Sequence, residues 1–184
     1  MAAVISPTST PFELLAALEA KCRTKASGLP AQEEVREEWT GVLFRLREQF
    51  LLAPMAEVSE IVSLPDVTRV PGVRPWVLGL ANMRGNLLPV MDLQGFLYGE
   101  ASTADPKSRR LLVVNQGGVY AGLLVDAVLG MKHLWVDEQA EELPPLPDSL
   151  RPYILTSFSR LGEHQAVFSP ARLVESRGFL EVAS

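Results

Sequence analysis

Few residues in this 184-residue chain have the types and spacing that catalysis requires. The only histidines are His133 and His164, and Ser157 and Ser159 lie in a strand pattern instead of at the sharp strand-to-helix turn that carries a nucleophilic serine. No glycine precedes a lysine and no Gly-x-Gly-x-x-Gly motif occurs, so phosphate-cradling loops are missing. One alternative stays open: a small β-barrel ligand-binding protein or hydrolase that uses His164 with a nearby carboxylate.

Metal, nucleic-acid and membrane functions find no support in the composition. Cys22 is the only cysteine, which excludes an intramolecular disulfide framework and a cysteine-based zinc site. The net charge of −5 argues against nucleic acid as a partner, because phosphate contacts need a basic surface. No segment is apolar for the roughly 18 residues that a spanning helix needs. We therefore expect a cytoplasmic protein with no cofactor, no metal and no direct membrane insertion.

The first 38 residues are predicted to form a helical N-terminal extension. Thr10, Pro11 and Glu13 are typical of a helix start, with a hydroxyl at the N-cap, proline at the first turn and glutamate at the third position. Leu14, Leu18 and Cys22 follow at four-residue steps and form one apolar stripe. The stripe predicts that the Cys22 thiol is buried and inert.

From about residue 39 to residue 184 the pattern becomes that of a β domain. Val42, Phe44 and Leu46 alternate with Arg45 and Arg47, as in a half-buried strand. Many short strands with glycine and proline between them favour small barrels over a parallel sheet. The further predicted strands are Val58–Leu64, Val67–Val70, Val77–Met83, Asn86–Asp92, Leu111–Asn115, Val119–Val125, Leu134–Val136, Tyr153–Arg160 and Gln165–Phe168.

Two segments are predicted to be loops, and three residues are predicted to be structural. The polar segment Glu100–Ser108 is expected to link two lobes, and the proline-rich, acidic segment Asp137–Pro147 cannot pair as a central strand. Asp92 and Asp126 end strands, where a carboxylate can cap backbone N–H groups. Trp76 is expected to hold a loop against a barrel.

Several motifs follow one another in an order that resembles that of the CheW family. The members of this family are adaptors that couple chemoreceptors to the histidine kinase CheA. The motifs are Glu57–Val58–Ser59–Glu60–Ile61–Val62, Val67–Thr68–Arg69–Val70–Pro71–Gly72, Val77 to Gly85 with its Asn82–Met83–Arg84–Gly85 turn, Leu88 to Leu93, and Gly122 to Gly130. The resemblance covers about Trp39 to Glu175 and implies a mainly β fold of two small SH3-like β-barrel lobes. The long extension and the acidic insert are most similar to the CheW-like proteins of systems that control twitching motility by type IV pili.

The resemblance implies a non-enzymatic adaptor with two partners, a CheA-like histidine kinase and the cytoplasmic tip of a chemoreceptor, at receptor arrays. An outward-facing Val58 beside Glu60 would form a small amphipathic patch. Gly79 marks either a strand bulge or a close approach by another chain. Arg84 is either a turn residue or a polar anchor for a partner, and Met131 lies either in the core or at a binding surface. The predicted partner-binding residues are Val58, Glu60, Gly79, Arg84 and Met131.

Overall fold

The structure, a computed structural model, describes residues 10–25, 36–160 and 162–183. The chain divides into two compact units, Met1–Val35 and Arg36–Ser184. The first strand of the second unit, β1, begins at Glu38. Each unit is described by itself below.

The described part of the first unit is one helix, α1 (Pro11–Lys25). Its start is the predicted capping box: the backbone N–H of Thr10 donates to the Glu13 carboxylate at 2.9 Å, and the Glu13 N–H donates to the Thr10 hydroxyl at 3.4 Å. The predicted burial of Cys22 is wrong, because this side chain is exposed. The described residues of this unit form a single helix, and a single helix has no second apolar layer against which its stripe can be buried.

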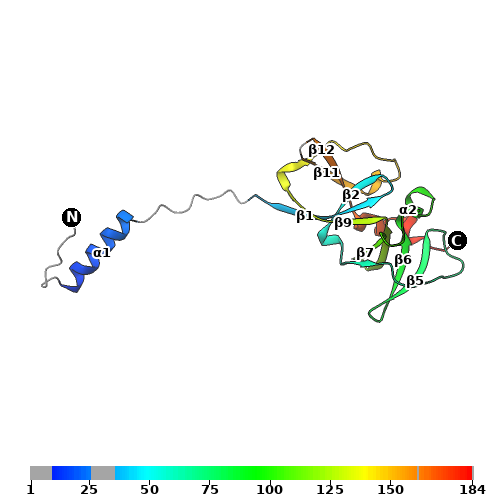
Figure 1. Ribbon diagram of the computed structural model, residues 1–184, viewed down its shortest axis with the longest axis horizontal. Coiled ribbons are helices and arrows are strands. Elements are labelled where there is room, and N and C mark those ends of the chain that lie inside the picture. The colour runs from blue at the N-terminus through cyan, green and yellow to red at the C-terminus, as the bar shows by residue number, and fades with distance from the viewer. Residues whose placement is uncertain (1–9, 26–35, 161, 184) are drawn as a thin grey trace. The chain divides into compact units, whose positions relative to one another are not determined.

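The second unit contains two curled sheets (Figure 1). In the first sheet the strands run, in spatial order, β10 (Gln139–Ala140), β11 (Ile154–Arg160), β12 (Glu163–Phe168), β2 (Gln49–Pro54), β1 (Glu38–Leu46) and β9 (Ala127–Trp135). In the second sheet they run β4 (Val67–Thr68), β5 (Val77–Met83), β6 (Asn86–Asp92), β8 (Val119–Val125), β7 (Arg110–Gln116) and β3 (Glu60–Ser63). The short helices are α2 (Leu93–Tyr98), α3 (Pro170–Glu175) and α4 (Arg177–Leu180), with 3-10 turns η1 (Met55–Glu57), η2 (Val136–Glu138) and η3 (Arg151–Tyr153).

The two sheets share one topology. In each, the central pair is parallel, β6 with β8 and β12 with β2, and the other pairs are antiparallel. Corresponding hairpins carry a register shift at corresponding places, between Val77 and Gly79 in β5 and between Ile154 and Thr156 in β11. The order of the strands along the chain differs between the two sheets. The β1–β2 hairpin precedes the other strands of its sheet, whereas the corresponding β7–β8 hairpin follows the other strands of its own sheet.

Each sheet closes on itself through a short connection between its two edge strands. Residues 64–66 join β3 to β4, and η2 joins β9 to β10. In both cases four Cα steps separate the strand ends, and four steps span at most roughly 14 Å. The edges must therefore lie near one another, which curls each sheet into a half-barrel. This confirms the predicted mainly β fold of two barrel-like lobes.

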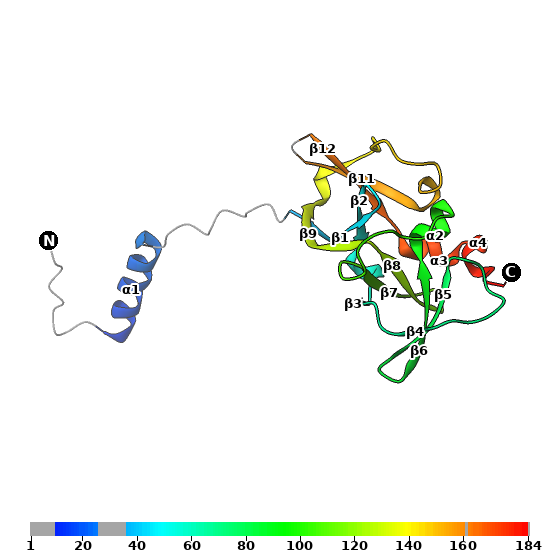
Figure 2. The same ribbon diagram turned by 45° about the vertical axis from the view of Figure 1, so that its right-hand side comes forward.

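A shared core holds the two lobes together. Val42, Phe44 and Leu46 of β1 face it, as the alternation predicted. The strands β2, β7 and β8 are buried on both faces. Their neighbouring residues point in turn to the shared core and to a smaller core inside one half-barrel, as in the pairs Leu51 and Leu52, Leu112 and Leu111, and Leu123 and Leu124. In both views β11 and β12 lie on one side of the unit and the β5–β6 hairpin on the other, with β7 between them (Figure 2).

Two predicted structural roles are confirmed at the border of this core. Trp76 stacks on Phe179 with ring centroids 5.6 Å apart and meets Phe96 edge-on at 5.1 Å. Asp92 is buried and accepts the Gly95 N–H at 3.1 Å, so it caps α2.

The connections differ from the prediction in two places. The segment Glu100–Ser108 joins α2 to β7, which belong to the same lobe, so the predicted link between lobes is wrong. The chain instead passes between lobes at η1 and after Val125. Strand β9 begins at Ala127, well before the predicted strand Leu134–Val136. The sequence pattern did not reveal its first part, because residues 129–133 are all exposed and so lack the alternation that marks a half-buried strand. The only strand in the segment Asp137–Pro147 is β10, an edge strand, as expected for its prolines.

We predict that Phe44→Ala lowers the free energy of unfolding by about 3–5 kcal/mol, because it leaves a cavity in the shared core. Phe44 is 0% exposed and meets the Phe168 ring edge-on at 5.9 Å. The control is Phe50→Ala, at a side chain that is 52% exposed, where we expect a loss of about 1 kcal/mol or less. Denaturant unfolding followed by tryptophan fluorescence measures both. Equal losses in the two variants would show that the lobes do not depend on the shared core.

Candidate functional site

Two predicted partner-binding residues, Glu60 and Arg84, meet on the surface of the second lobe. Arg84 Nη1 donates to Glu60 Oε1 at 2.8 Å. Glu60 opens the edge strand β3, whereas Arg84 lies in the turn between β5 and β6, so the curled sheet brings them together across 24 residues. The side chains are 78% exposed for Arg84 and 35% exposed for Glu60. The pair therefore presents a guanidinium and a carboxylate to solvent side by side.

The Arg84 backbone has a conformation that few side chains adopt. Met83 pairs with Asn86, so Arg84 and Gly85 form a two-residue hairpin loop with φ of 51° and 88°. Positive φ at both residues defines the type I′ turn that suits the twist of a hairpin. The Asn82 side chain accepts the Gly85 N–H at 2.9 Å and stabilises the turn. A left-handed arginine costs on the order of 1–2 kcal/mol, so its side chain is presented at an energetic cost.

Gly79 occupies a bulge in β5 next to a close approach by the protein's own chain. The register of β5 on β6 shifts between Val77 and Gly79, and Gly79 has φ of 140°. A Cβ atom here would lie 2.1 Å from the carbonyl oxygen of Thr68 in β4. The bulge reading is confirmed, and glycine is required because both the conformation and the space exclude a side chain.

The expectation that Val58 faces outward is wrong. Its side chain is 5% exposed and belongs to the shared core, which Ile61 also touches. Val58 directly follows the 3-10 turn η1 as its C-cap, and the ladder of β3 begins only at Glu60. The period-2 alternation is therefore interrupted between Val58 and Glu60, and the two do not share a face.

Met131 lies on the surface of the other lobe. It is 59% exposed in the edge strand β9, opposite Val42 of β1. Leu129 of the same strand and Met55 of η1 are also exposed. These two exposed apolar residues were not found from the sequence, because an apolar residue in a strand pattern is usually buried.

A buried polar network lies at the junction of the two lobes, and its contacts were not predicted from the sequence. Asp126 accepts the Arg47 N–H at 2.6 Å from the first lobe, and it accepts the Ser102 hydroxyl. The Ser102 N–H donates to the second carboxylate oxygen of Asp92 at 3.1 Å, so one serine joins both buried aspartates. The structural role predicted for Asp126 is confirmed. The sequence signal for it was a carboxylate inside an apolar run.

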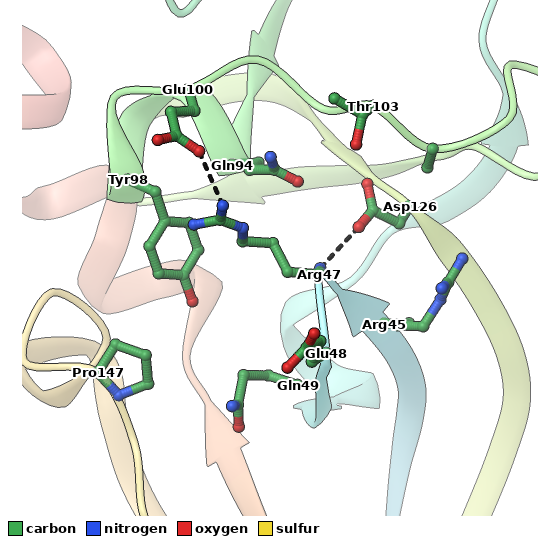
Figure 3. Close-up of a pocket in the computed structure, with 11 residues that line it drawn as sticks. Arg45, Arg47, Glu48, Gln49, Gln94, Tyr98, Glu100, Thr103, Asp126 and Pro147 are labelled. Atoms are coloured by element: carbon green, nitrogen blue, oxygen red, sulfur yellow. Dashed lines mark hydrogen bonds and ion pairs between the residues drawn. The ribbon is translucent and has the colours of Figure 1, made fainter.

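Asp126 of this network also lines a polar cavity of about 550 Å³ (Figure 3). The Arg47 side chain crosses it, pairs with Glu100 at 2.7 Å and places its guanidinium 5.1 Å from the centre of the Tyr98 ring. The Tyr98 hydroxyl is buried, and no residue that the structure describes forms a hydrogen bond with it. Burial raises the pKa of the Tyr98 phenol, and the positive charge of Arg47 opposes that rise.

The described residues do not assemble the catalytic alternative at His164. The imidazole is half-buried in the β11–β12 hairpin opposite Ser159, and its Nδ1 has no hydrogen-bond partner among the residues that the structure describes. The Ser157 hydroxyl is within hydrogen-bond distance of two carbonyl oxygens, that of Ala140 at 3.1 Å and that of Glu142 at 2.6 Å, to which it can donate. A nearby cavity of about 320 Å³ is lined by Glu163 and Gln165 but not by His164. A nucleophile–base pair is therefore not formed here.

Two further observations concern the described residues. They contain no group of three or more His, Cys, Asp or Glu side chains arranged to hold a metal ion. Among the helices of these segments, none is both long enough and apolar enough to span a membrane.

Comparison with known proteins identifies relatives over most of the chain. The profile of the CheW-like domain family matches residues 40–177. A protein named PilI from Pseudomonas aeruginosa is 49% identical over 179 residues, which cover 97% of this chain and 99% of PilI. FrzA of Myxococcus xanthus is 32% identical over 61% of this chain and 68% of its own. The crystal structure of the scaffolding protein TtCheW from Thermoanaerobacter tengcongensis superposes with a TM-score of 0.65 at 25% identity, covering 77% of this chain and 96% of TtCheW.

The lone Tyr98 hydroxyl leads to a prediction about pH. An unfolded tyrosine loses its proton near pH 10, and folded Tyr98 loses it at a higher pH. The free energy that the neutral phenol contributes is therefore fully present below about pH 10 and is lost as the pH rises through the folded pKa. We expect Tyr98→Phe to melt no lower than the unmodified protein at pH 7 and to lose less stability as the pH rises above about 10.

Thermal melts across this pH range test the expectation, and Tyr120→Phe serves as the control for removing one phenol. A Tyr98→Phe protein that melts lower at pH 7 would show that the hydroxyl has a partner after all.

Proposed function

We propose, from the premise that the chain belongs to the CheW-like family, that it is a non-enzymatic adaptor coupling a chemoreceptor to a CheA-like histidine kinase. The partners would be the kinase and the cytoplasmic tip of the receptor, and the protein would act in the cytoplasm at membrane receptor arrays. Its likeness to PilI covers both units of the chain and supports a place in the system that controls twitching motility by type IV pili.

The observation that carries this proposal is the exposed pair of Glu60 and Arg84. Exposed ion pairs contribute about 0–1 kcal/mol to folding, so stability alone gives little reason to hold a left-handed arginine there. At an interface the same groups become desolvated, and a buried arginine or carboxylate can contribute 2 kcal/mol or more to binding, by order of magnitude. The arginine offers a planar fork of donors, and the carboxylate beside it selects against acidic partners that approach in the wrong register.

The remaining predicted site residues have different parts in this proposal. Gly79 keeps β4 and β5 close, which positions the hairpin that carries Arg84. Val58 is buried, so we assign it the role of holding η1 and the start of β3 in place beneath Glu60. Met131 presents an adaptable apolar side chain on the other lobe and is proposed to contact a second partner.

Coupling follows from the way the two lobes are joined. If one partner binds the β5–β6 hairpin of the second lobe and another binds β9 of the first, the shared core holds them at a set distance. Receptor and kinase would then influence one another through a rigid spacer, and each would change the affinity of the other by the same factor.

We predict that Arg84→Ala weakens binding of the CheA-like kinase or of the receptor tip at least about tenfold, or about 1.4 kcal/mol, with little change in melting temperature. The matched control is Arg151→Ala, which removes another exposed arginine from an ion pair, with Asp148 at 3.2 Å. Titration calorimetry with each purified partner measures affinity, and a thermal melt measures folding. Unchanged affinity for both partners would reject the Glu60–Arg84 surface.

A charge exchange sharpens the experiment. Glu60→Arg should weaken the same association, and the double variant Glu60→Arg/Arg84→Glu restores the internal pair with its polarity reversed. If both residues touch a partner, the double variant stays weak, whereas recovery would mean that the pair acts only within this protein. Val58→Arg is unsuitable here, because a charge at that buried site destabilises the fold itself.

A further inference from the structure

The outer face of the second sheet carries an apolar groove of about 360 Å³. It runs across β5, β6 and β8 and is bounded by α4 and the C-terminal segment that follows it. Its lining is almost wholly apolar, and Leu180 at its edge is 52% exposed. Thirteen residues line it. They include Gly79 and, at its rim, Val73, Leu80, Pro89, Tyr120, Leu180 and Val182.

Beside the groove lie two arginines that have no partner in the described part of the chain. Arg69 and Arg74 are exposed, and they line a shallower pocket that shares Val70, Val73 and Val77 with the groove. Neither guanidinium has an ion pair or a hydrogen bond among the described residues.

The other described arginines beyond residue 35 behave differently, with Arg45 the one exception. Arg36, Arg47, Arg84, Arg151, Arg160 and Arg177 pair with carboxylates, and Arg109, Arg110 and Arg172 donate to backbone carbonyls. In a chain with net charge −5, two neighbouring arginines that no described carboxylate neutralises form a local surface of opposite sign.

The backbone of the groove cannot accept an added strand. Each of β5, β6 and β8 has a hydrogen-bonded strand on both sides. The loop before β5 is also occupied, because the Arg74 N–H donates to the carbonyl oxygen of Val182 at 2.9 Å. An occupant must therefore be recognised through side chains, and the element that presents a continuous apolar stripe without free backbone groups is a helix.

We propose that this groove is a docking site for an amphipathic helix of a partner protein, with an apolar stripe in the groove and flanking carboxylates on Arg69 and Arg74. The site does not include Glu60 or Arg84 and does not depend on the adaptor function proposed above. The apolar contacts supply affinity, whereas the exposed arginines accelerate association and select an acidic partner. Binding should accordingly weaken as salt rises.

The test uses the full chain and a defined probe. The probe is a fluorescein-labelled, end-capped helical peptide of about 18 residues, with leucines spaced i, i+3, i+4 and i+7 and glutamates flanking the stripe. A second peptide replaces every glutamate by lysine. Fluorescence anisotropy measures both affinities at about 50 mM and about 500 mM salt.

We expect saturable binding of the glutamate peptide, at least tenfold tighter than the lysine peptide at low salt. The double variant Arg69→Glu/Arg74→Glu should reverse this preference, and Leu180→Glu should abolish binding by placing a charge in the groove. These positions are exposed, so the melting temperature should hold. Arg151→Glu, a charge reversal on the other lobe, should leave binding unchanged.

Several results would overturn the proposal. They are equal binding of the two peptides, no saturable binding, or equal weakening by Arg151→Glu. If the apolar dye ANS fills the groove and the peptide does not displace it, the site takes a small apolar molecule instead and the helix proposal is wrong. None of these results bears on the kinase or receptor binding proposed for Arg84.

Discussion

Burial of β2, β7 and β8 on both faces is the constraint on which the second unit depends. Each strand supplies side chains to a small core inside its own half-barrel and to the larger core between the lobes. A half-barrel separated from its partner would expose one full apolar face, including Leu51, Leu112 and Leu123. The lobes are therefore two sheets but one cooperative structure, and the polar network of Asp126 and Ser102 completes their junction where apolar contacts end.

The two lobes are versions of one design, with a parallel central pair, a bulged hairpin and a capped helix after the central strand. Asp92 caps α2 after β6, and Ser169 caps α3 after β12 through the Arg172 N–H at 3.1 Å. The second lobe follows this design in chain order, whereas the first is shifted circularly, because its β1–β2 hairpin comes before the rest. This arrangement ties the ends of the unit together, since the first hairpin and β12 must pair to complete one sheet.

Because the central strands are committed to the cores, surfaces available for recognition lie on hairpins, edge strands and outer faces. The Glu60–Arg84 pair, Met131 on β9, and the groove beside Arg69 and Arg74 all have this character. Side chains at such places contribute little to folding, so their residue types can suit a partner without destabilising the fold. The polar cavity at Tyr98 differs, because the Arg47 side chain that crosses it is already paired with Glu100 and lies against the Tyr98 ring.

Local chemistry was readable from the sequence. The Thr10 capping box, strands β5, β6 and β8, and the turn at Arg84–Gly85 depend on neighbouring residues, and the motif order pointed to the CheW family. Contacts between distant residues were not readable. The Glu60–Arg84 bond, the burial of Val58 and the network of Ser102 with two aspartates depend on how the sheets curl. A shared topology with shifted chain order likewise leaves no fixed period in the sequence. Propensity and turn chemistry act over a few residues, whereas burial and ion pairing are decided only when remote strands pack together.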